Sequence, residues 1–214
     1  NVFQGLLVAQ PDQFETPEKF VHLWLHESER VYGDRLVSAE DLIKYNGLAQ
    51  TQAKKLFSQF SIAKFYAAEN ADPLLFCHFA ENIQDKCYDQ VINMGDLSGI
   101  LEDALAEYNE MNIPMNLVLF VDAMAHVCRV SRIISQPAGH AMLVGVGGSG
   151  KQSLTRLGAF ICNATFFQIQ LTKTYNTNNL LEDFKPLYRQ AGVAGKPAAF
   201  IFTDKEIKDC LLYT

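Results

Sequence analysis

Apolar residues recur at helical spacing over roughly the first 137 positions of the chain. After the segment Thr-Pro-Glu at 16–18, one face carries Phe20, Leu23, Trp24 and Val31. This segment combines a capping threonine, a proline in the first turn and an acid near the positive end of a helix. We therefore predict a helix that begins at about residue 17.

Three further helices are predicted in this part of the chain. Ser38, with Asp41 three residues later, predicts a capping box that opens the second helix. Apolar residues at four-residue spacing predict the third over 97–108. The fourth is expected over 116–135, because Pro137 prevents the helix from continuing. Residues 1–115 are thus predicted to form a helical region with a connector.

The remaining sequence alternates short apolar runs with helices, which is typical of an α/β fold. Strands are predicted at 141–144, 166–169 and 198–202, and helices at 151–162 and 180–191. This order implies parallel pairing in a doubly wound sheet. We expect a partial parallel sheet with helices on both faces, preceded by the helical region.

The segment between the first predicted strand and its helix is rich in glycine and carries one lysine. Glycines let backbone N–H groups curl around phosphate oxygens. The following helix points its positive end at the same anion, and a lysine reaches the outer phosphates. The alternative is a glycine-rich turn without a ligand. The predicted nucleotide-binding residues, for ATP or ADP, are Gly145, Val146, Gly147, Gly148, Ser149, Gly150, Lys151, Gln152 and Ser153.

One position departs from the usual phosphate loop. The residue after the lysine is normally Ser or Thr, whose hydroxyl binds Mg²⁺. Here it is Gln152, and Ser153 is rotated by about 100° around the helix. The amide oxygen of Gln152 is a weaker candidate ligand for Mg²⁺. The departure therefore bears more on catalysis than on phosphate binding.

A second acid is expected on a neighbouring strand. The apolar strand at 198–202 leads to Asp204 at its C-terminal end, where ligands of open α/β sheets bind. Asp204 is therefore the predicted Mg²⁺ ligand, and the alternative is an ordinary turn aspartate. Lys205 follows in place of a water-activating glutamate, which leaves Glu206 as a weak catalytic candidate.

Composition and charge reduce the number of functional classes to consider. The formal net charge is -6, and no dense Lys/Arg run occurs, which disfavours nucleic acid and anionic membranes as partners. No apolar run reaches the ~18 residues of a membrane span. The five scattered cysteines favour reduced thiols in a cytosolic compartment. His22 and His26, beside Glu27, do not match a metalloprotease helix, so a metal is not expected there.

The loop and its flanks resemble a known family. HVCRVSRIISQP at 126–137, with the loop through residue 157, resembles the start of the fourth AAA+ module of axonemal dynein heavy chains. Upstream, 23–36 looks like the helical lid of the third module. Downstream, 174–180 and 201–207 are most similar to outer-arm heavy chains of the gamma type. The resemblance covers about residues 3–209.

The resemblance implies a minus-end-directed microtubule motor of the ciliary or flagellar axoneme. In that family the first AAA+ module carries most of the hydrolysis, and the fourth is regulatory. By the family pattern, Gly145, Gly150 and Lys151 bind phosphate, and Asp204 is the Walker B acid. The implied partners are neighbouring AAA+ modules of the same chain and, through the parent protein, microtubules and dynein intermediate and light chains.

Three functions remain open from the sequence. They are a regulatory ATP-binding module with slow or no hydrolysis, a static nucleotide-binding joint of the ring, and an unrelated P-loop kinase or transferase. Residues 116–209 would be the first part of the AAA+ module. Residues 210–214 depart from the family pattern and are expected not to be native. The family places a further strand after residue 214, so we expect the isolated chain to bind ATP weakly or not at all.

Overall fold

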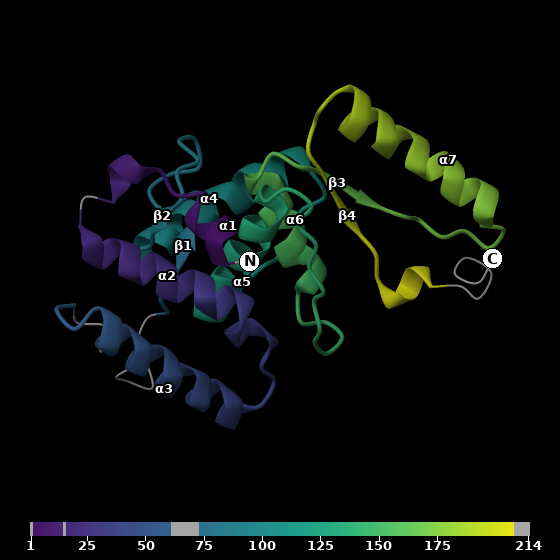
Figure 1. Ribbon diagram of the computed structural model, residues 1–214. Coiled ribbons are helices and arrows are strands. Elements are labelled where there is room, and N and C mark those ends of the chain that lie inside the picture. Colours follow the sequence, from purple (N-terminus) through teal and green to yellow (C-terminus); the bar gives the residue numbers. More distant parts are fainter. Residues whose placement is uncertain (1, 15, 61–72, 208–214) are drawn as a thin grey trace. The chain divides into compact units, whose positions relative to one another are not determined.

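The computed structural model describes residues 2–14, 16–60 and 73–207, which Figure 1 traces from purple to yellow. The chain forms two compact units. Unit 1 comprises residues 1–103 and 119–129, and unit 2 comprises 104–118 and 130–214. Residues 210–214, which we expect not to be native, lie outside the described part of the chain.

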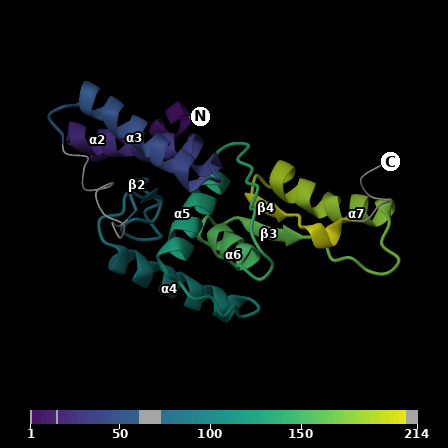
Figure 2. The ribbon, with the colours of Figure 1, turned by 90° about the horizontal axis from the view of Figure 1, so that it is seen from below.

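Unit 1 is mainly helical. Figures 1 and 2 show α2 and α3 side by side, and the rings of Trp24 and Phe57 lie 6.3 Å apart. Its elements are α1 (Val2–Leu6), η1 (Pro11–Gln13), α2 (Pro17–Val31), η2 (Gly33–Arg35), α3 (Ala39–Leu56), β1 (Phe76–Cys77), β2 (Asp89–Gln90) and the first parts of α4 (Met94–Met111) and α5 (Val121–Ser135). The helices predicted from residues 17, 38 and 97 are thus confirmed.

The two predicted caps of these helices differ in outcome. At the start of α2, the Thr16 side chain accepts a hydrogen bond from the Lys19 amide, as its position predicted. Ser38 does precede α3, but its side chain makes no capping bond, so the predicted capping box is wrong. The partner it required, Asp41, lies instead 3.6 Å from the ammonium of Lys44.

The core of unit 1 forms between α2, α3 and the short antiparallel pair β1–β2. Each fully buried apolar side chain contributes about 1.5–3 kcal/mol to stability. The core residues are Val21, Leu23, Leu25, Ala53, Leu74, Phe76 and Tyr88. The strand pair was not predicted, because two residues per strand leave no alternating pattern to detect.

Several polar residues of α2 are also buried and hydrogen-bonded. His26 Nδ1 lies 2.9 Å from the Leu74 carbonyl, and the Tyr88 hydroxyl donates to Glu27 at 2.6 Å. His22 Nδ1 lies 3.1 Å from the side-chain oxygen of Gln90. These bonds connect the helix to the strand pair. In the described part of the chain, no three or more side chains of His, Cys, Asp and Glu come together as a set of metal ligands.

Unit 2 contains a parallel strand pair. Its elements are α6 (Lys151–Ile161), β3 (Thr165–Gln168), α7 (Thr177–Tyr188), the π-helical turn η4 (Arg189–Val193), β4 (Ala198–Ile201), η5 (Asp204–Glu206) and the later parts of α4 and α5. The strands β3 and β4 pair in parallel, with Phe167 opposite Phe200 and Gln168 opposite Ile201. The second and third predicted strands and their parallel pairing are therefore confirmed.

A helix contacts each face of this small sheet. On one face, the Phe200 ring meets Phe184 of α7 edge-on at 5.7 Å. On the other face, Arg156 of α6 lies over the ring of Phe166 at 4.9 Å. Alternate residues of a strand point to opposite faces, so α6 and α7 lie on opposite faces. The α/β class with helices on both faces is confirmed (Figure 1).

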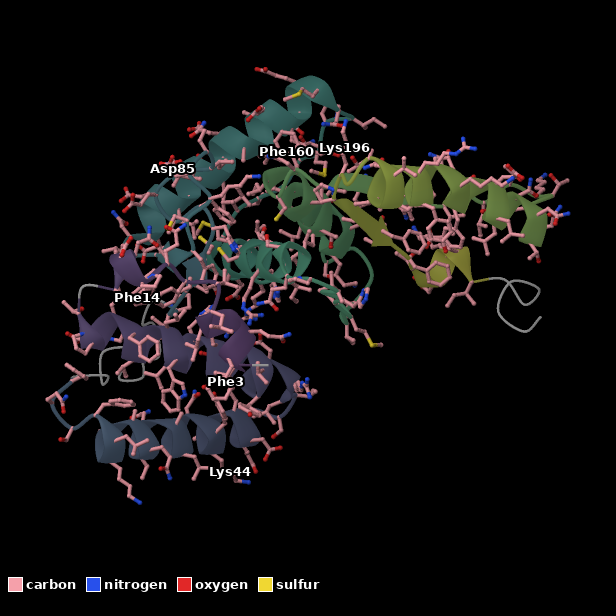
Figure 3. All side chains as sticks on the ribbon, turned by 45° about the horizontal axis from the view of Figure 1, so that its top comes forward. Phe3, Phe14, Lys44, Asp85, Phe160 and Lys196 are labelled. Carbon is pink, nitrogen blue, oxygen red and sulfur yellow. The ribbon has the colours of Figure 1, made fainter. Side chains whose placement is uncertain are left out.

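Helix α6 packs against the parts of α4 and α5 that belong to unit 2. Its Phe160, labelled in Figure 3, meets Tyr108 edge-on at 5.4 Å. At Gly158 the backbone passes so close to α5 that an added Cβ would lie 3.1 Å from Val130 Cγ1. Among the residues that the structure describes, no helix is long and apolar enough to cross a membrane.

Three predicted elements need correction. Residues 141–144 form no strand, and Met142 and Val144 are 90% and 84% exposed. A parallel strand needs a neighbour for its backbone groups, and β3 and β4 pair only with each other in the described chain. Helix α5 begins at Val121, not at 116, and α7 begins three residues earlier than predicted because Asn176 caps it.

Candidate nucleotide-binding site

The predicted phosphate loop forms an exposed turn directly before α6. Gly148 and Gly150 have φ values of +80° and +76°, a left-handed conformation that residues with a Cβ rarely adopt. A Cβ added at Gly147 or Gly148 would have no neighbour within 4 Å. Gly147 and Gly148 therefore leave room beside the loop backbone for a large anion.

Lys151 is the first residue of α6, and its side chain extends back into the loop. Its ammonium donates hydrogen bonds to the carbonyls of Gly145 and Val146, both at 2.7 Å, and to the hydroxyl of Ser149 at 3.1 Å. The loop thus curves around a positive charge. Since the first turn of α6 contains no acidic residue and Gly150 offers no capping side chain, that turn can bind an anion.

The residues proposed for Mg²⁺ lie at two separate places. Gln152 and Ser153 are half-buried in the first turn of α6. Asp204 is exposed at the start of η5, which two residues separate from the end of β4. Within the residues described, no hydrogen bond or ion pair joins Asp204 to the loop. The position of Asp204 at the C-terminal end of a parallel strand agrees with the sequence, while its metal binding stays a prediction.

Glu206 has a different environment from Asp204. Its side chain is only 5% exposed. Its carboxylate accepts from the amide and hydroxyl of Thr203, at 2.6 and 2.5 Å, and from the Gln168 amide group at 2.9 Å. Burial alone would raise the pKa of Glu206, but the bonds from Thr203 and Gln168 hold that pKa below its usual value. The carboxylate is therefore ionised, and both of its oxygens accept hydrogen bonds from groups of the protein.

Two residues near this site were missed by sequence reasoning. Arg156 of α6 donates a hydrogen bond of 3.0 Å to the side-chain oxygen of Gln168, the last residue of β3. The only signal for Gln168 is a polar residue at the end of an apolar strand, where site residues of parallel sheets collect. Arg156 has no signal beyond its place on the loop helix.

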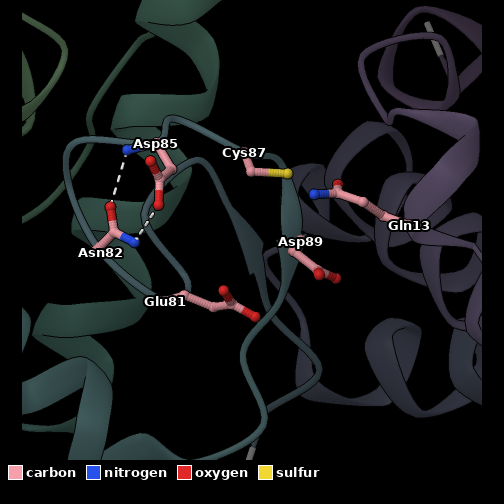
Figure 4. Close-up of a pocket in the computed structure, with 6 residues that line it drawn as sticks. All are labelled: Gln13, Glu81, Asn82, Asp85, Cys87 and Asp89. Atoms are coloured by element: carbon pink, nitrogen blue, oxygen red, sulfur yellow. Dashed lines mark hydrogen bonds between the residues drawn. The ribbon is translucent and has the colours of Figure 1, made fainter.

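A separate pocket lies in unit 1, far from the loop in sequence (Figure 4). It is lined by Gln13, Glu81, Asn82, Asp85, Cys87 and Asp89. Asn82 bonds to Asp85 through its side-chain amide at 2.6 Å, and Lys19 pairs with Asp89 at 2.7 Å. Three carboxylates would repel nucleotide phosphates, so this pocket does not compete with the loop as a nucleotide site.

Comparison with known families agrees with this geometry. Residues 115–214 match the family described as the P-loop containing dynein motor region D4, and residues 1–64 match the AAA+ lid domain. The glycine loop before α6 and the parallel strands β3 and β4 lie within the first match. The chain is therefore a P-loop AAA+ region with a preceding lid.

Similar proteins define the family more narrowly. The chain is 54% identical to the dynein alpha chain of the flagellar outer arm of Chlamydomonas reinhardtii, 44% to human dynein axonemal heavy chain 17 and 46% to the ciliary dynein beta chain of Tripneustes gratilla. Each alignment covers 98% of this chain but only 5% of the relative. The chain belongs to the axonemal dynein heavy chain family, which leaves the unrelated kinase without support.

Proposed function

We propose that this segment is an ATP-binding regulatory AAA+ module, the fourth of a dynein heavy chain, within a minus-end-directed microtubule motor. The observation that carries the proposal is the loop around Lys151. Its ammonium is held by two loop carbonyls at the start of a helix whose first turn has no acid. In a nucleotide complex, the Lys151 ammonium would exchange these carbonyls for an oxygen of the outer phosphates.

The remaining site residues have distinct parts in this proposal. The backbone amides of residues 145–150 would donate to the phosphates, and Gln152 and Ser153 would contact them from the first turn of α6. Asp204 would hold Mg²⁺, with Gln152 as a weaker second ligand. The ion, when bound, would neutralise phosphate charge. Carboxylate and amide oxygens suit this cation, so the donors fit it.

Slow or absent hydrolysis is the proposed behaviour of this site. Gln152 replaces the hydroxyl that usually binds Mg²⁺, and Lys205 follows Asp204 where a glutamate would activate water. Glu206 already accepts three hydrogen bonds from the protein. These observations also favour the second candidate, a static nucleotide-binding joint of the ring. The two differ in whether ATP at this site is ever turned over.

The module assignment, the partners and the location of the complete protein are proposed from family membership. Residues 1–115 would be the lid and connector of the third module, and 116–209 the first part of the fourth, in line with the D4 description of the matching family. The gamma-type outer-arm position stays a prediction. Microtubules, intermediate and light chains, neighbouring AAA+ modules and an axonemal location in cilia or flagella are proposed for the whole heavy chain.

The decisive test is nucleotide binding to this loop alone. A full-length heavy chain is prepared in which the phosphate-loop lysines of the other AAA+ modules are replaced by alanine. Binding of a fluorescent ATP analogue is then titrated with and without Mg²⁺. Lys151→Ala should weaken binding at least about 100-fold, since it removes the charge that faces the outer phosphates.

The matched control is Lys185→Ala, which removes an exposed lysine paired with Glu182 on α7. Its affinity should equal that of the parent chain. Equal affinities of the parent and Lys151→Ala chains would refute the proposal. Single-turnover release of phosphate from the parent chain then separates the two candidates, because a static joint retains ATP unhydrolysed.

A further inference from the structure

A continuous chain of side chains joins the loop helix to the turn that carries Asp204. It runs from Arg156 on α6 to Gln168 at the end of β3, at 3.0 Å. It continues from Gln168 to Glu206 at 2.9 Å and ends at Thr203, whose amide and hydroxyl both donate to the same carboxylate oxygen. All these residues belong to unit 2.

The position of this chain is set by the sheet. Gln168 pairs in register with Ile201, so the C-terminal ends of β3 and β4 lie at one edge. Arg156 follows Lys151 by five residues, which is about 7.5 Å along the helix axis. The hydrogen bonds therefore join the Asp204 turn to α6 within one and a half helical turns of the phosphate loop.

The turn around Asp204 depends on Glu206. Thr203 and Glu206 form a reciprocal capping box around η5, in which the Thr203 side chain also accepts from the Lys205 amide. Glu206 is buried, whereas Asp204, between Thr203 and Lys205, is exposed. The turn thus fixes the Glu206 side chain inside the protein and directs the Asp204 side chain outward.

We propose that Glu206 is a positioning residue of the nucleotide site: it fixes the turn that presents Asp204 and, through Gln168 and Arg156, connects that turn to the phosphate-loop helix. This inference rests on the proposed function for the role of Asp204. It assigns Glu206 no contact with substrate and no part in water activation. Its contribution is to keep the Asp204 carboxylate in one place relative to the loop.

The first test compares the effect of Mg²⁺ on nucleotide affinity. In the full-length background described above, the parent chain and Asp204→Asn, Glu206→Ala and the double variant are titrated with fluorescent ATP, in Mg²⁺ and in EDTA. The Mg²⁺-dependent gain in affinity should fall about tenfold in each single variant. Affinity in EDTA should stay within about twofold, and the double variant should lose no more than either single one.

Glu182→Ala is the matched control, because it removes an exposed glutamate on α7 that pairs with Lys185. It should keep the full Mg²⁺ gain. A Glu206→Ala chain that keeps this gain, or that loses affinity equally in Mg²⁺ and in EDTA, overturns the positioning role while leaving the proposed function intact.

A second readout needs no ligand. Hydrogen exchange of the free protein is measured in Glu206→Ala, where the amides of Thr203 and Lys205 should exchange at least about tenfold faster and those of α6 should be little affected. Unchanged exchange at Thr203 overturns the inference whatever the nucleotide result. A parent chain that binds no nucleotide overturns the proposed function instead, and the exchange result then decides alone whether Glu206 fixes the turn.

Discussion

Helix α2 of unit 1 and the phosphate loop of unit 2 both concentrate polar residues, but they use them in opposite ways. In α2, His26 and Glu27 are 1% and 0% exposed, and each has a hydrogen-bond partner on a different segment. In the loop, residues 145–149 are all exposed, and the bonds of Lys151 are to the loop itself.

This difference separates structural polar groups from those available to a ligand. Burying a polar group costs free energy unless it is hydrogen-bonded, so the polar residues of α2 belong to the folded core. The loop groups make no comparable contribution to packing. Substitutions in α2 and its neighbours should therefore change stability, and substitutions in the loop should change ligand affinity.

The largest expected effect is a loss of stability caused by a substitution next to α2. A Cβ added at Gly5 of α1 would lie 1.6 Å from Glu27 Oε2, so Gly5→Ala must displace a fully buried carboxylate and its bond from Tyr88. We expect unit 1 to lose about 3 kcal/mol of unfolding free energy. Urea unfolding followed by fluorescence measures this, because the single tryptophan, Trp24, lies in α2.

Gly47→Ala is the matched control. An added Cβ there has no neighbour within 4 Å, and the residue lies inside α3. Alanine should stabilise that helix by up to about 1 kcal/mol, so the two changes have opposite signs. Equal effects of Gly5→Ala and Gly47→Ala would show that the burial of Glu27 does not govern the stability of unit 1.

A smaller effect is expected at the loop. Gln152→Ser restores a hydroxyl at the position that usually binds Mg²⁺ and should raise Mg²⁺-dependent ATP affinity about tenfold, or about 1.4 kcal/mol. Fluorescent-ATP titration in the single-site background measures it. The same change at an exposed helical glutamine, Gln52→Ser, should leave affinity unaltered. A loss of Mg²⁺ dependence in Gln152→Ser would instead identify the amide as the better ligand.

Sequence patterns predicted those elements whose signals are local. The start of α2 is set by Thr16 and Pro17, and the loop by its own glycines and Lys151, so each could be located without knowing the rest of the fold. The β3–β4 pairing followed from the order of strands and helices.

Features that depend on distant partners were not predictable. The run 141–144 has the composition of a strand, but a strand forms only where another strand supplies hydrogen bonds. The Arg156–Gln168–Glu206 connection joins residues up to 50 positions apart, and no spacing rule relates them. Glu206 therefore looked like a weak catalytic candidate, when its contacts are with Thr203 and Gln168.

The smallest expected effect concerns His126, an exposed histidine in the same unit as α2. It lies on the exposed face of α5, whereas Cys128 of the same helix is buried. Partial burial and the charge of Arg129 lower the pKa of His126. A lowered folded pKa gives stability that is present above the unfolded pKa of about 6.5 and is lost as the pH falls through the folded value.

We therefore expect the stability of unit 1 to fall between pH 7.5 and 5 by about 0.5 kcal/mol more in the unsubstituted 214-residue chain than in its His126→Gln variant. The effect is small because water screens an exposed ring. Urea unfolding followed by Trp24 fluorescence at each pH measures it, with His140→Gln in unit 2 as the control. If the pH dependence stays the same in His126→Gln, the buried His22 and His26 of α2 are the groups to test next, and exposure alone does not decide which polar residues matter for folding.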